Sequence, residues 1–220
     1  MPAEYFEARE RALLGERYDT LYAAPQETAA RGVTVSALRT TPEGFAARAD
    51  LPLRPSPFCK AAFVVEQPDF KPGRHPYHHA GVFYSQEPSA SSAAPLLGVR
   101  PGMRVLDLCA APGGKSLLLI EEMGDEGRLV SCDVSENRVQ LIRKAVERMG
   151  FAHVEPRVSD GTKPDADLPM ADAILVDAPC SGLGILAKKP DIRYKTLEKA
   201  RHDELLATQS AILDTAASLL

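Results

Sequence analysis

The chain carries its most chemically distinctive run at residues 105–116, which read Val-Leu-Asp-Leu-Cys-Ala-Ala-Pro-Gly-Gly-Lys-Ser. The run begins with an apolar stretch, and another with the spacing of a helix follows it. Small residues let the backbone approach a ligand closely, and N–H groups at the start of a helix attract anions. The run therefore predicts a ligand-binding loop in which the lysine ammonium offsets the charge of a carboxylate. Its members are Cys109, Ala110, Ala111, Pro112, Gly113, Gly114 and Lys115.

The spacing within this loop argues against two other classes of nucleotide-binding protein. The loop lacks the Gly-x-x-x-x-Gly-Lys-Ser/Thr pattern of the phosphate-binding loop. It also lacks the Gly-x-Gly-x-x-Gly pattern of nicotinamide-dependent oxidoreductases. A tight strand-to-helix turn without a ligand is the structural alternative, because a Gly-Gly pair alone is weak evidence for binding.

Three aspartates, Asp133, Asp160 and Asp177, each follow a later apolar run. Ligands of parallel sheets bind at the carboxyl ends of the strands, where an acid about 20 residues after a glycine loop holds ribose hydroxyls. Asp133 lies near that spacing, and Asp160 is suited to accept a hydrogen bond from an adenine amino group. Structural alternatives stay open: Asp133 or Ser135 caps the next helix, and Asp160-Gly161 is a common turn pair.

The segment 177–182, Asp-Ala-Pro-Cys-Ser-Gly, places an acid, a proline and a thiol together. A cysteine at the edge of a sheet, near helix dipoles, is a good nucleophile once ionised. Asp177 and Cys180 are therefore the candidate catalytic residues. The alternative for Cys180 is a small buried residue, the usual environment of a free cysteine.

Two groups of cations are candidates for binding. Arg138 falls in the first turn of a predicted helix, where a solvated surface arginine is the alternative to a residue that lines the ligand pocket. The basic segment 188–195 includes Lys188, Lys189 and Arg193 next to a tyrosine. Basic residues beside an aromatic suit RNA phosphates and an unstacked base. A solvated loop explains the charge equally well.

The elements that must position these residues fall into two parts. Residues 1–75 predict a small α+β domain with a helix at 4–22 and β-like runs at 33–38 and 63–66, broken by prolines. Residues 76–220 alternate strands with helices, which predicts an α/β fold with a parallel sheet. The predicted strands are 104–108, 128–132, 154–158 and 173–176, and the helices are 117–123, 136–149 and 205–220.

The composition of the chain limits the remaining classes of function and binding partner. The net charge of −4 excludes a generally basic surface, so binding to a nucleic acid must rest on a local patch. The four cysteines form no Cys-x-x-Cys pair, and His75, His78 and His79 lack an acidic or thiol partner nearby. We therefore expect no metal and interpret the histidines as packing residues. The sequence has neither a signal peptide nor a membrane-length apolar run, which predicts a cytoplasmic protein without a membrane partner.

The runs 108–115 and 177–182 resemble the Nop/Sun family of RNA cytosine-5 methyltransferases. His75–His78 and Gln86–Ala90 are similar to its bacterial ribosomal RNA small-subunit methyltransferase F-like branch. The resemblance implies a Rossmann-like S-adenosylmethionine-dependent methyltransferase sheet, incomplete at about four parallel strands. It also implies S-adenosylmethionine as cofactor, RNA as partner (ribosomal RNA above all) and methylation of cytosine carbon 5.

The resemblance also implies a role for each matched position. The Cys109–Lys115 loop binds S-adenosylmethionine, Asp133 holds its ribose, Arg138 lines the same pocket and Asp160 meets the adenine. Asp177 faces the methyl donor and the target cytosine, whose developing charge it stabilises. In the family mechanism a thiolate adds to carbon 6 of cytosine, carbon 5 takes the methyl group, and loss of the carbon-5 proton and the thiol completes the reaction.

One departure from the family pattern concerns the nucleophile. The resemblance implies that Cys180 assists product release, while the nucleophile sits in a Thr-Cys segment after a fifth strand. The sequence stops at Leu220, before that segment. The chain is then a fragment, a natural truncation that only binds cofactor or RNA, or an enzyme with Cys180 as nucleophile. On the first two explanations we expect no methyl transfer. We also expect an unprotected edge on the fourth strand.

Overall fold

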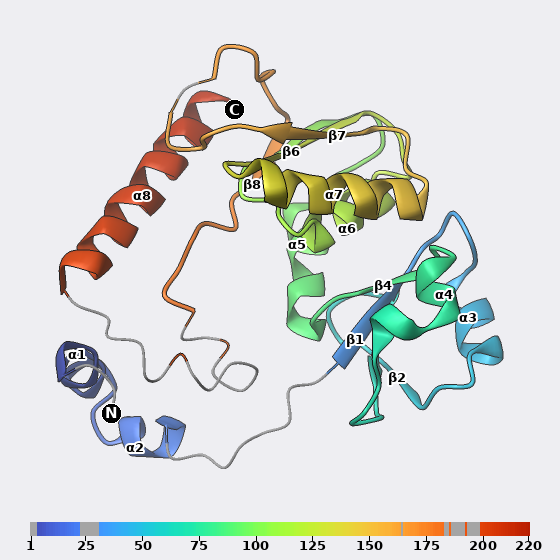
Figure 1. The fold of residues 1–220 in the computed structure, drawn as a ribbon, viewed down its shortest axis with the longest axis horizontal. Helices are drawn as coiled ribbons and strands as arrows, with labels where there is room; N and C mark the ends of the chain where they lie inside the picture. The colour runs from blue at the N-terminus through green and yellow to red at the C-terminus, as the bar shows by residue number, and fades with distance from the viewer. Residues whose placement is uncertain (1–3, 23–30, 164, 183–184, 186–191, 193–198) are drawn as a thin grey trace. The chain divides into compact units, whose positions relative to one another are not determined.

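The computed structural model describes all of the chain except residues 1–3, 23–30, 164, 183–184, 186–191 and 193–198 (Figure 1). The chain forms two compact units. The smaller unit comprises residues 1–29 and 179–210, and the larger unit comprises residues 30–178 and 211–220. Within the described residues, no helix is both long enough and apolar enough to cross a membrane.

An antiparallel sheet opens the larger unit. Its strand order is β2-β3-β1-β4, with β1 at Arg31–Val35, β2 at Leu53–Pro55, β3 at Ala62–Val65 and β4 at Phe83–Ser85 (Figure 1). Thr41 caps helix α3 (Pro42–Arg48) by accepting a hydrogen bond from the Gly44 N–H. This helix supplies Phe45 to a core rich in β-branched and aromatic residues. The core is made of Val33, Val35, Phe45, Phe63, Val65, Phe70 and Phe83.

Two short helical turns, η1 at Pro72–Arg74 and α4 at Pro76–His79, lie between β3 and β4, while η2 at Pro88–Ser92 and α5 at Ala93–Leu97 connect this sheet to the next. The N-terminal sheet includes β4, which lies beyond residue 75, where the sequence analysis placed the boundary between the two parts. The His75 side chain accepts a hydrogen bond from the Tyr77 N–H at 3.1 Å and packs against Phe70 and Phe83. Within the described residues, no group of histidines, cysteines and acids could hold a metal ion.

A parallel sheet follows in the order β7-β6-β5-β8, with β5 at Arg104–Asp107, β6 at Arg128–Asp133, β7 at Val154–Val158 and β8 at Ala173–Leu175. Helices α6 (Gly114–Glu122) and α7 (Glu136–Met149) pack on one face through a large apolar cluster that includes Leu118 and Ile142. A second cluster on this sheet includes the end of helix α8 (Lys199–Ser218). This arrangement confirms the predicted α/β fold of a parallel sheet preceded by a small α+β part.

Helix α7 coincides with its predicted bounds because its two determinants are local. Val139, Ile142, Val146 and Met149 repeat at helical spacing and are all buried. Gly150 ends the helix with a φ of 84°, in the left-handed region that favours glycine.

Other helices depart from their predicted bounds. The helix predicted at 4–22 is two helices, α1 (Glu4–Leu14) and α2 (Arg17–Tyr22), because Gly15 takes a φ of 54° between them. Helix α6 begins at Gly114 and α8 at Lys199, both before the predicted starts. Their first residues are polar or small, so an apolar repeat does not reveal them.

The smaller unit contains contacts between neighbouring helices and between segments more distant in sequence. The Arg11 guanidinium lies 4.1 Å from the centre of the Tyr18 ring, a cation–π contact within α1 and α2. The Tyr5 and His202 rings meet edge to face with centres 6.1 Å apart. The Gln209 side chain donates to the Pro179 carbonyl at 2.8 Å, which joins α8 to the segment that carries Cys180.

Candidate functional site

The Cys109–Lys115 loop connects β5 to α6 as predicted. The Ala110 N–H donates to the Cys132 carbonyl of β6 at 2.8 Å, and the Gly113 N–H donates to the Ala110 carbonyl at 2.7 Å. Gly113 precedes the helix with a φ of 103°, which favours glycine. The loop is therefore tied to the neighbouring strand, and the first turn of α6 begins directly after it.

Asp107, at the carboxyl end of β5, is fully buried. The Ser116 hydroxyl donates to its Oδ2 at 2.7 Å, while Oδ1 has no hydrogen-bond partner among the described residues. Burial, the largest cause, raises the pKa of Asp107 to about 7. Buried acceptors are nearly always satisfied, so Oδ1 is an unused position for a donor. Sequence reasoning gave Asp107 no role, although an acid that ends an apolar run was a signal.

Asp133 ends β6 and is almost fully buried. Its Oδ1 accepts the Ser135 N–H at 3.1 Å, and its Oδ2 lies 3.3 Å from Nη1 of Arg138. Nη2 of Arg138 donates to the Ala111 carbonyl at 2.9 Å. Arg138 therefore joins Asp133 to the glycine loop, unlike a purely solvated arginine. Ser135 occupies the N-cap position of α7, but its side chain makes no capping hydrogen bond.

Asp160 follows β7 and forms the turn that the sequence left open as an alternative. Its Oδ1 accepts hydrogen bonds from the Thr162 N–H at 3.1 Å and the Thr162 hydroxyl at 2.6 Å. Lys163 pairs with Oδ2 at 3.1 Å. The Thr162 hydrogen bonds, followed by that of Lys163, lower the pKa of Asp160. A Cβ on Gly161 would lie 3.6 Å from the Leu108 carbonyl, so this turn packs beside the start of the glycine loop.

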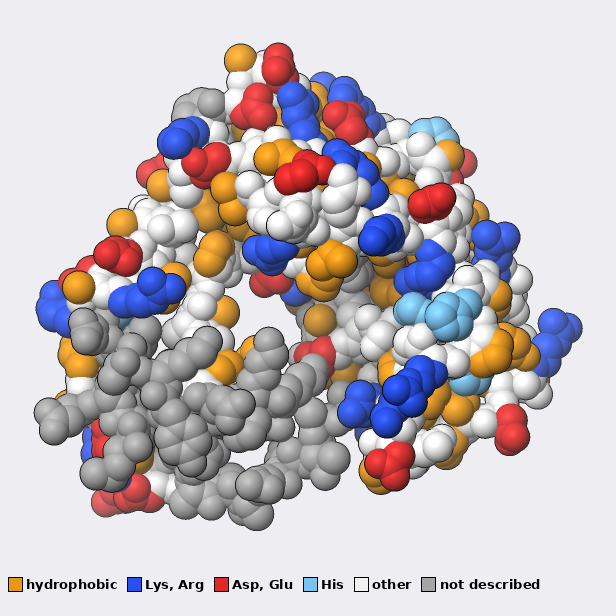
Figure 2. All heavy atoms as spheres, viewed as in Figure 1, with side chains coloured by type: hydrophobic (Ala, Val, Ile, Leu, Met, Phe, Trp, Pro, Cys, Tyr) orange, Lys and Arg blue, Asp and Glu red, His pale blue; other side chains and the backbone are white. Residues whose placement is uncertain are grey.

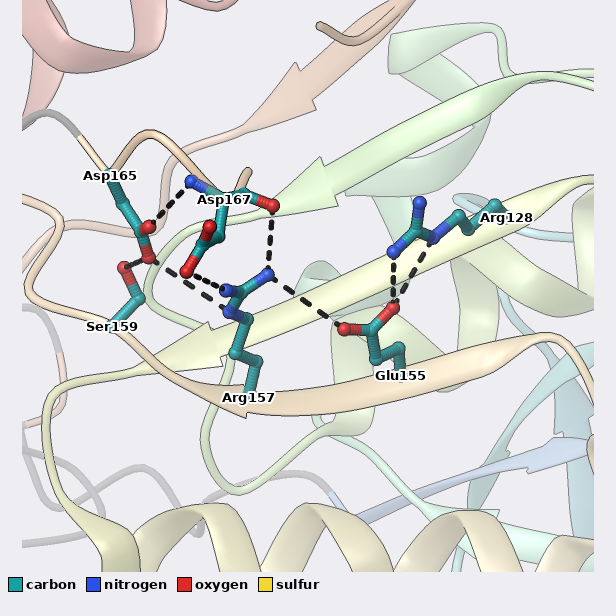
Figure 3. A network of polar contacts seen from close by, with 6 residues as sticks. All are labelled: Arg128, Glu155, Arg157, Ser159, Asp165 and Asp167. Atoms are coloured by element: carbon teal, nitrogen blue, oxygen red, sulfur yellow. Dashed lines mark hydrogen bonds and ion pairs between the residues drawn. The ribbon is translucent and has the colours of Figure 1, made fainter. Parts of the chain in front are cut away.

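A polar network holds the loop that contains Asp160 against β7 (Figure 3). Arg157 donates from Nη1 to the Asp167 carbonyl at 3.0 Å, and its Nη2 lies 3.4 Å from the Asp167 carboxylate. The Ser159 hydroxyl donates to Asp165 at 3.0 Å. On the neighbouring strand, Arg128 pairs with Glu155 at 2.6 Å. The loop is thereby closed by side chains from its own two ends.

Asp177 lies just beyond β8, at the same end of the sheet. The Leu108 N–H donates to the Leu175 carbonyl at 3.1 Å, which aligns β8 with the start of the glycine loop. Nζ of Lys115 lies 2.5 Å from Oδ2 of Asp177. The lysine that the sequence assigned to a ligand carboxylate thus pairs with a protein carboxylate in this structure.

Cys180 and the three basic residues of segment 188–195 complete the set of predicted residues. Cys180 is exposed and belongs to the smaller unit, so the interpretation as a small buried residue is wrong. Burial raises the pKa of Cys109 to about 11 and that of Cys132 to about 12, which disfavours both thiolates. The predicted RNA-binding residues Lys188, Lys189 and Arg193 lie outside the described residues. On the face that Figure 2 shows, basic and acidic side chains are interspersed.

The parallel sheet and its loop define the chain as having a methyltransferase fold. Residues 94–220 match the family described as 16S rRNA methyltransferase RsmB/F, and residues 1–88 match the N-terminal domain of 16S rRNA methyltransferase RsmF. The chain belongs to the RsmB/F family of 16S rRNA methyltransferases, which depend on S-adenosylmethionine. This assignment confirms the predicted family.

The curated relatives are longer than this chain. It is 35% identical over 211 residues to ribosomal RNA small subunit methyltransferase F of Escherichia coli O157:H7 (strain EC4115 / EHEC), covering 90% of this chain and 43% of that protein. The match to the same protein of Enterobacter sp. (strain 638) is 34% identical with the same coverage. The chain therefore spans less than half the length of these curated relatives.

Solved structures share the fold. A methyltransferase homolog protein from Pyrococcus horikoshii is 26% identical with a TM-score of 0.81, covering 99% of this chain and 70% of that chain. NSun6 from Pyrococcus horikoshii with SFG has a TM-score of 0.82 at 17% identity, covering 97% of this chain and 79% of that chain. At that identity the second match concerns the fold alone.

Proposed function

We propose that the larger unit binds S-adenosylmethionine at the carboxyl end of its parallel sheet, and that the protein methylates cytosine carbon 5 in ribosomal RNA. One observation carries the proposal. Asp107, Asp133, Asp160 and Asp177 lie at the carboxyl ends of four adjacent parallel strands around a glycine loop, and one oxygen of Asp107 is a buried acceptor without a hydrogen-bond partner among the described residues. Carboxyl ends of parallel strands are the usual ligand site of such sheets.

The residues present fit this cofactor. Asp107 offers an acceptor to a buried donor, and the carboxylate of Asp133 suits a pair of ribose hydroxyls. Gly113 and Gly114 have no side chains of their own to keep a ligand away from the backbone. Asp160 is the candidate contact of the adenine, and Arg138 holds the loop to Asp133. When bound, S-adenosylmethionine supplies an electrophilic methyl group.

The chain's own residues divide the chemistry at the substrate end. Asp177, which pairs with Lys115, is the proposed acceptor of a hydrogen bond from the exocyclic amino group of a cytosine. Its charge stabilises the base as electron density shifts during attack. Cys180 presents an exposed thiol a few residues further along, for addition to the base or for release of the product. Lys188, Lys189 and Arg193 are proposed contacts of RNA phosphates.

Calorimetric titration of the full chain with S-adenosylmethionine tests the binding proposal. We expect saturable binding that weakens about tenfold or more in Asp133→Asn, since the neutral amide is a poorer acceptor for ribose hydroxyls. Asp172→Asn is the matched control, because Asp172 pairs with Arg104 at the amino end of the same sheet. Absence of binding to the unmodified chain, or equal loss in both variants, contradicts the proposal.

Incubation with methyl-labelled S-adenosylmethionine and small-subunit ribosomal RNA tests the reaction. Label on carbon 5 of cytosine, lost in Asp177→Asn, supports the proposed activity. Label on another base position contradicts it. Binding without any transfer favours the second candidate, a non-catalytic module that binds S-adenosylmethionine or RNA. The specific observation for this candidate is that burial raises the pKa of the Cys109 and Cys132 thiols, which disfavours both as nucleophiles.

A further inference from the structure

Gln86 makes a polar bridge between the antiparallel sheet and the glycine loop. It directly follows β4, and its Oε1 accepts the Thr34 hydroxyl of β1 at 3.1 Å. Its Nε2 donates to the Gly114 carbonyl at 3.2 Å. Gly114 is the first residue of α6, so the bridge ends on the turn that closes the loop.

The backbone of Gln86 is fixed as firmly as its side chain. Its N–H donates to the Gly32 carbonyl at 3.1 Å, and a Cβ on Gly32 would lie only 2.3 Å from the Gln86 carbonyl oxygen. No larger residue fits at position 32 without a backbone shift. Gln86 is 8% exposed, so water competes little for its amide.

The other side-chain links between the two sheets end elsewhere. Glu121 accepts the Ala37 N–H at 3.0 Å near the far end of α6. Arg148, near the end of α7, donates to the His78 carbonyl at 2.7 Å. Among the described hydrogen bonds that join the two sheets, only that of Gln86 reaches the loop.

We propose that Gln86 is a positioning residue for the cofactor site, an inference that rests on the proposed function. The Gly114 carbonyl can only accept, so it requires Nε2 on the side of the loop, and Oε1 then faces the Thr34 hydroxyl, which donates to it. The amide then holds the first turn of α6 in place before the cofactor arrives. A preformed loop binds more tightly, because less ordering is needed on binding.

A matched pair of methionine variants tests this role in the full chain. Gln86→Met removes the bridge with little change in volume, and Glu121→Met removes a link between the same sheets that ends away from the loop. We expect the Kd for S-adenosylmethionine to rise about five- to tenfold in Gln86→Met and less in Thr34→Val. Glu121→Met is expected to lower the melting temperature and leave the Kd within about twofold.

Hydrogen exchange in the free protein gives a readout that does not need the cofactor. Amides of residues 113–117 are expected to exchange faster in Gln86→Met and not in Glu121→Met. Unchanged loop exchange, or an equal rise in both variants, overturns the inference whether or not the cofactor binds. Faster loop exchange with an unchanged Kd also overturns it, while the proposed function stands. Failure of the unmodified chain to bind contradicts the proposed function alone.

Discussion

The two central strands of the parallel sheet, β5 and β6, each end in an aspartate. The outer strands β7 and β8 are each followed by one. The central pair is buried: Asp107 is 0% and Asp133 3% exposed. The outer pair is open, with side chains of Asp160 and Asp177 exposed by 39% and 55%. The same residue type at the same edge therefore occupies two environments.

The difference in burial suits the two pairs of aspartates to two kinds of binding partner. A buried carboxylate is costly, so Asp107 and Asp133 are held by fixed donors and suit a ligand of defined shape. The outer carboxylates keep contact with water and pair with the flexible ammonium groups of Lys115 and Lys163. Their environment suits a larger partner that arrives and leaves. We therefore expect the central half of the site to be rigid and the outer half to adapt.

The largest expected effect comes from Asp107→Asn. The pKa of Asp107 is raised from 3.8 to about 7 in the folded protein. Its contribution to the free energy of unfolding is therefore fully present below pH 3.8 and is lost as the pH rises to about 7. The loss is on the order of 4 kcal/mol, at about 1.4 kcal/mol per pH unit. We expect Asp107→Asn to remove this dependence and to be more stable than the unmodified chain at pH 8. Urea unfolding from pH 4 to pH 8 measures it.

Asp172→Asn is the control for this prediction, because Asp172 lies in an exposed ion pair that lowers its pKa. This substitution should leave the slope of the free energy of unfolding against pH unchanged between pH 5 and pH 7. Parallel pH curves for the unmodified chain and Asp107→Asn would show that Asp107 is not the buried acid that the structure describes.

Two glycine variants give an intermediate effect. Gly113 of the central half has a φ of 103°, whereas Gly161 of the outer half does not have a positive φ. Gly113→Ala should cost about 1–3 kcal/mol in the free energy of unfolding and weaken cofactor binding. Gly161→Ala should stay within about 0.5 kcal/mol, because its Cβ meets neighbours at ordinary distances from 3.6 Å. Equal losses in chemical denaturation would remove the distinction between rigid and adaptable halves.

The smallest expected effect comes from Asp160→Asn, and its dependence on pH has the opposite sign to that of Asp107. Hydrogen bonds, chiefly from Thr162, lower the pKa of Asp160, so its contribution is present above pH 3.8 and is lost as the pH falls through the folded pKa. Asp160→Asn should destabilise the protein at pH 7 by less than about 1 kcal/mol, since water screens the group. The deficit should vanish in acid. A deficit that grows in acid would contradict the assigned hydrogen bonds.

Local patterns predicted the elements, while the site's geometry depends on distant partners. The bounds of α7 follow from an apolar repeat and one glycine, and the parallel sheet follows from alternating strands and helices. The pairing of Lys115 with Asp177 joins residues 62 positions apart, which no local pattern reveals. The bridge from Thr34 through Gln86 to Gly114 likewise crosses two sheets. Burial of Asp107 depends on the helices that cover its strand.

The two edges of the parallel sheet differ in what they offer to another strand. Leu129 N–H donates to the His153 carbonyl and Ser159 N–H to the Asp133 carbonyl, so the odd-numbered residues of β7 face β6 and Pro156 faces outward. Proline has no N–H, which blocks the middle of that edge. On β8, Leu175 faces β5, so Ile174 turns both its N–H and its carbonyl outward. Among the described strands, β8 therefore turns both backbone groups of Ile174 toward its outer edge, whereas Pro156 removes one hydrogen-bond donor from the outer edge of β7.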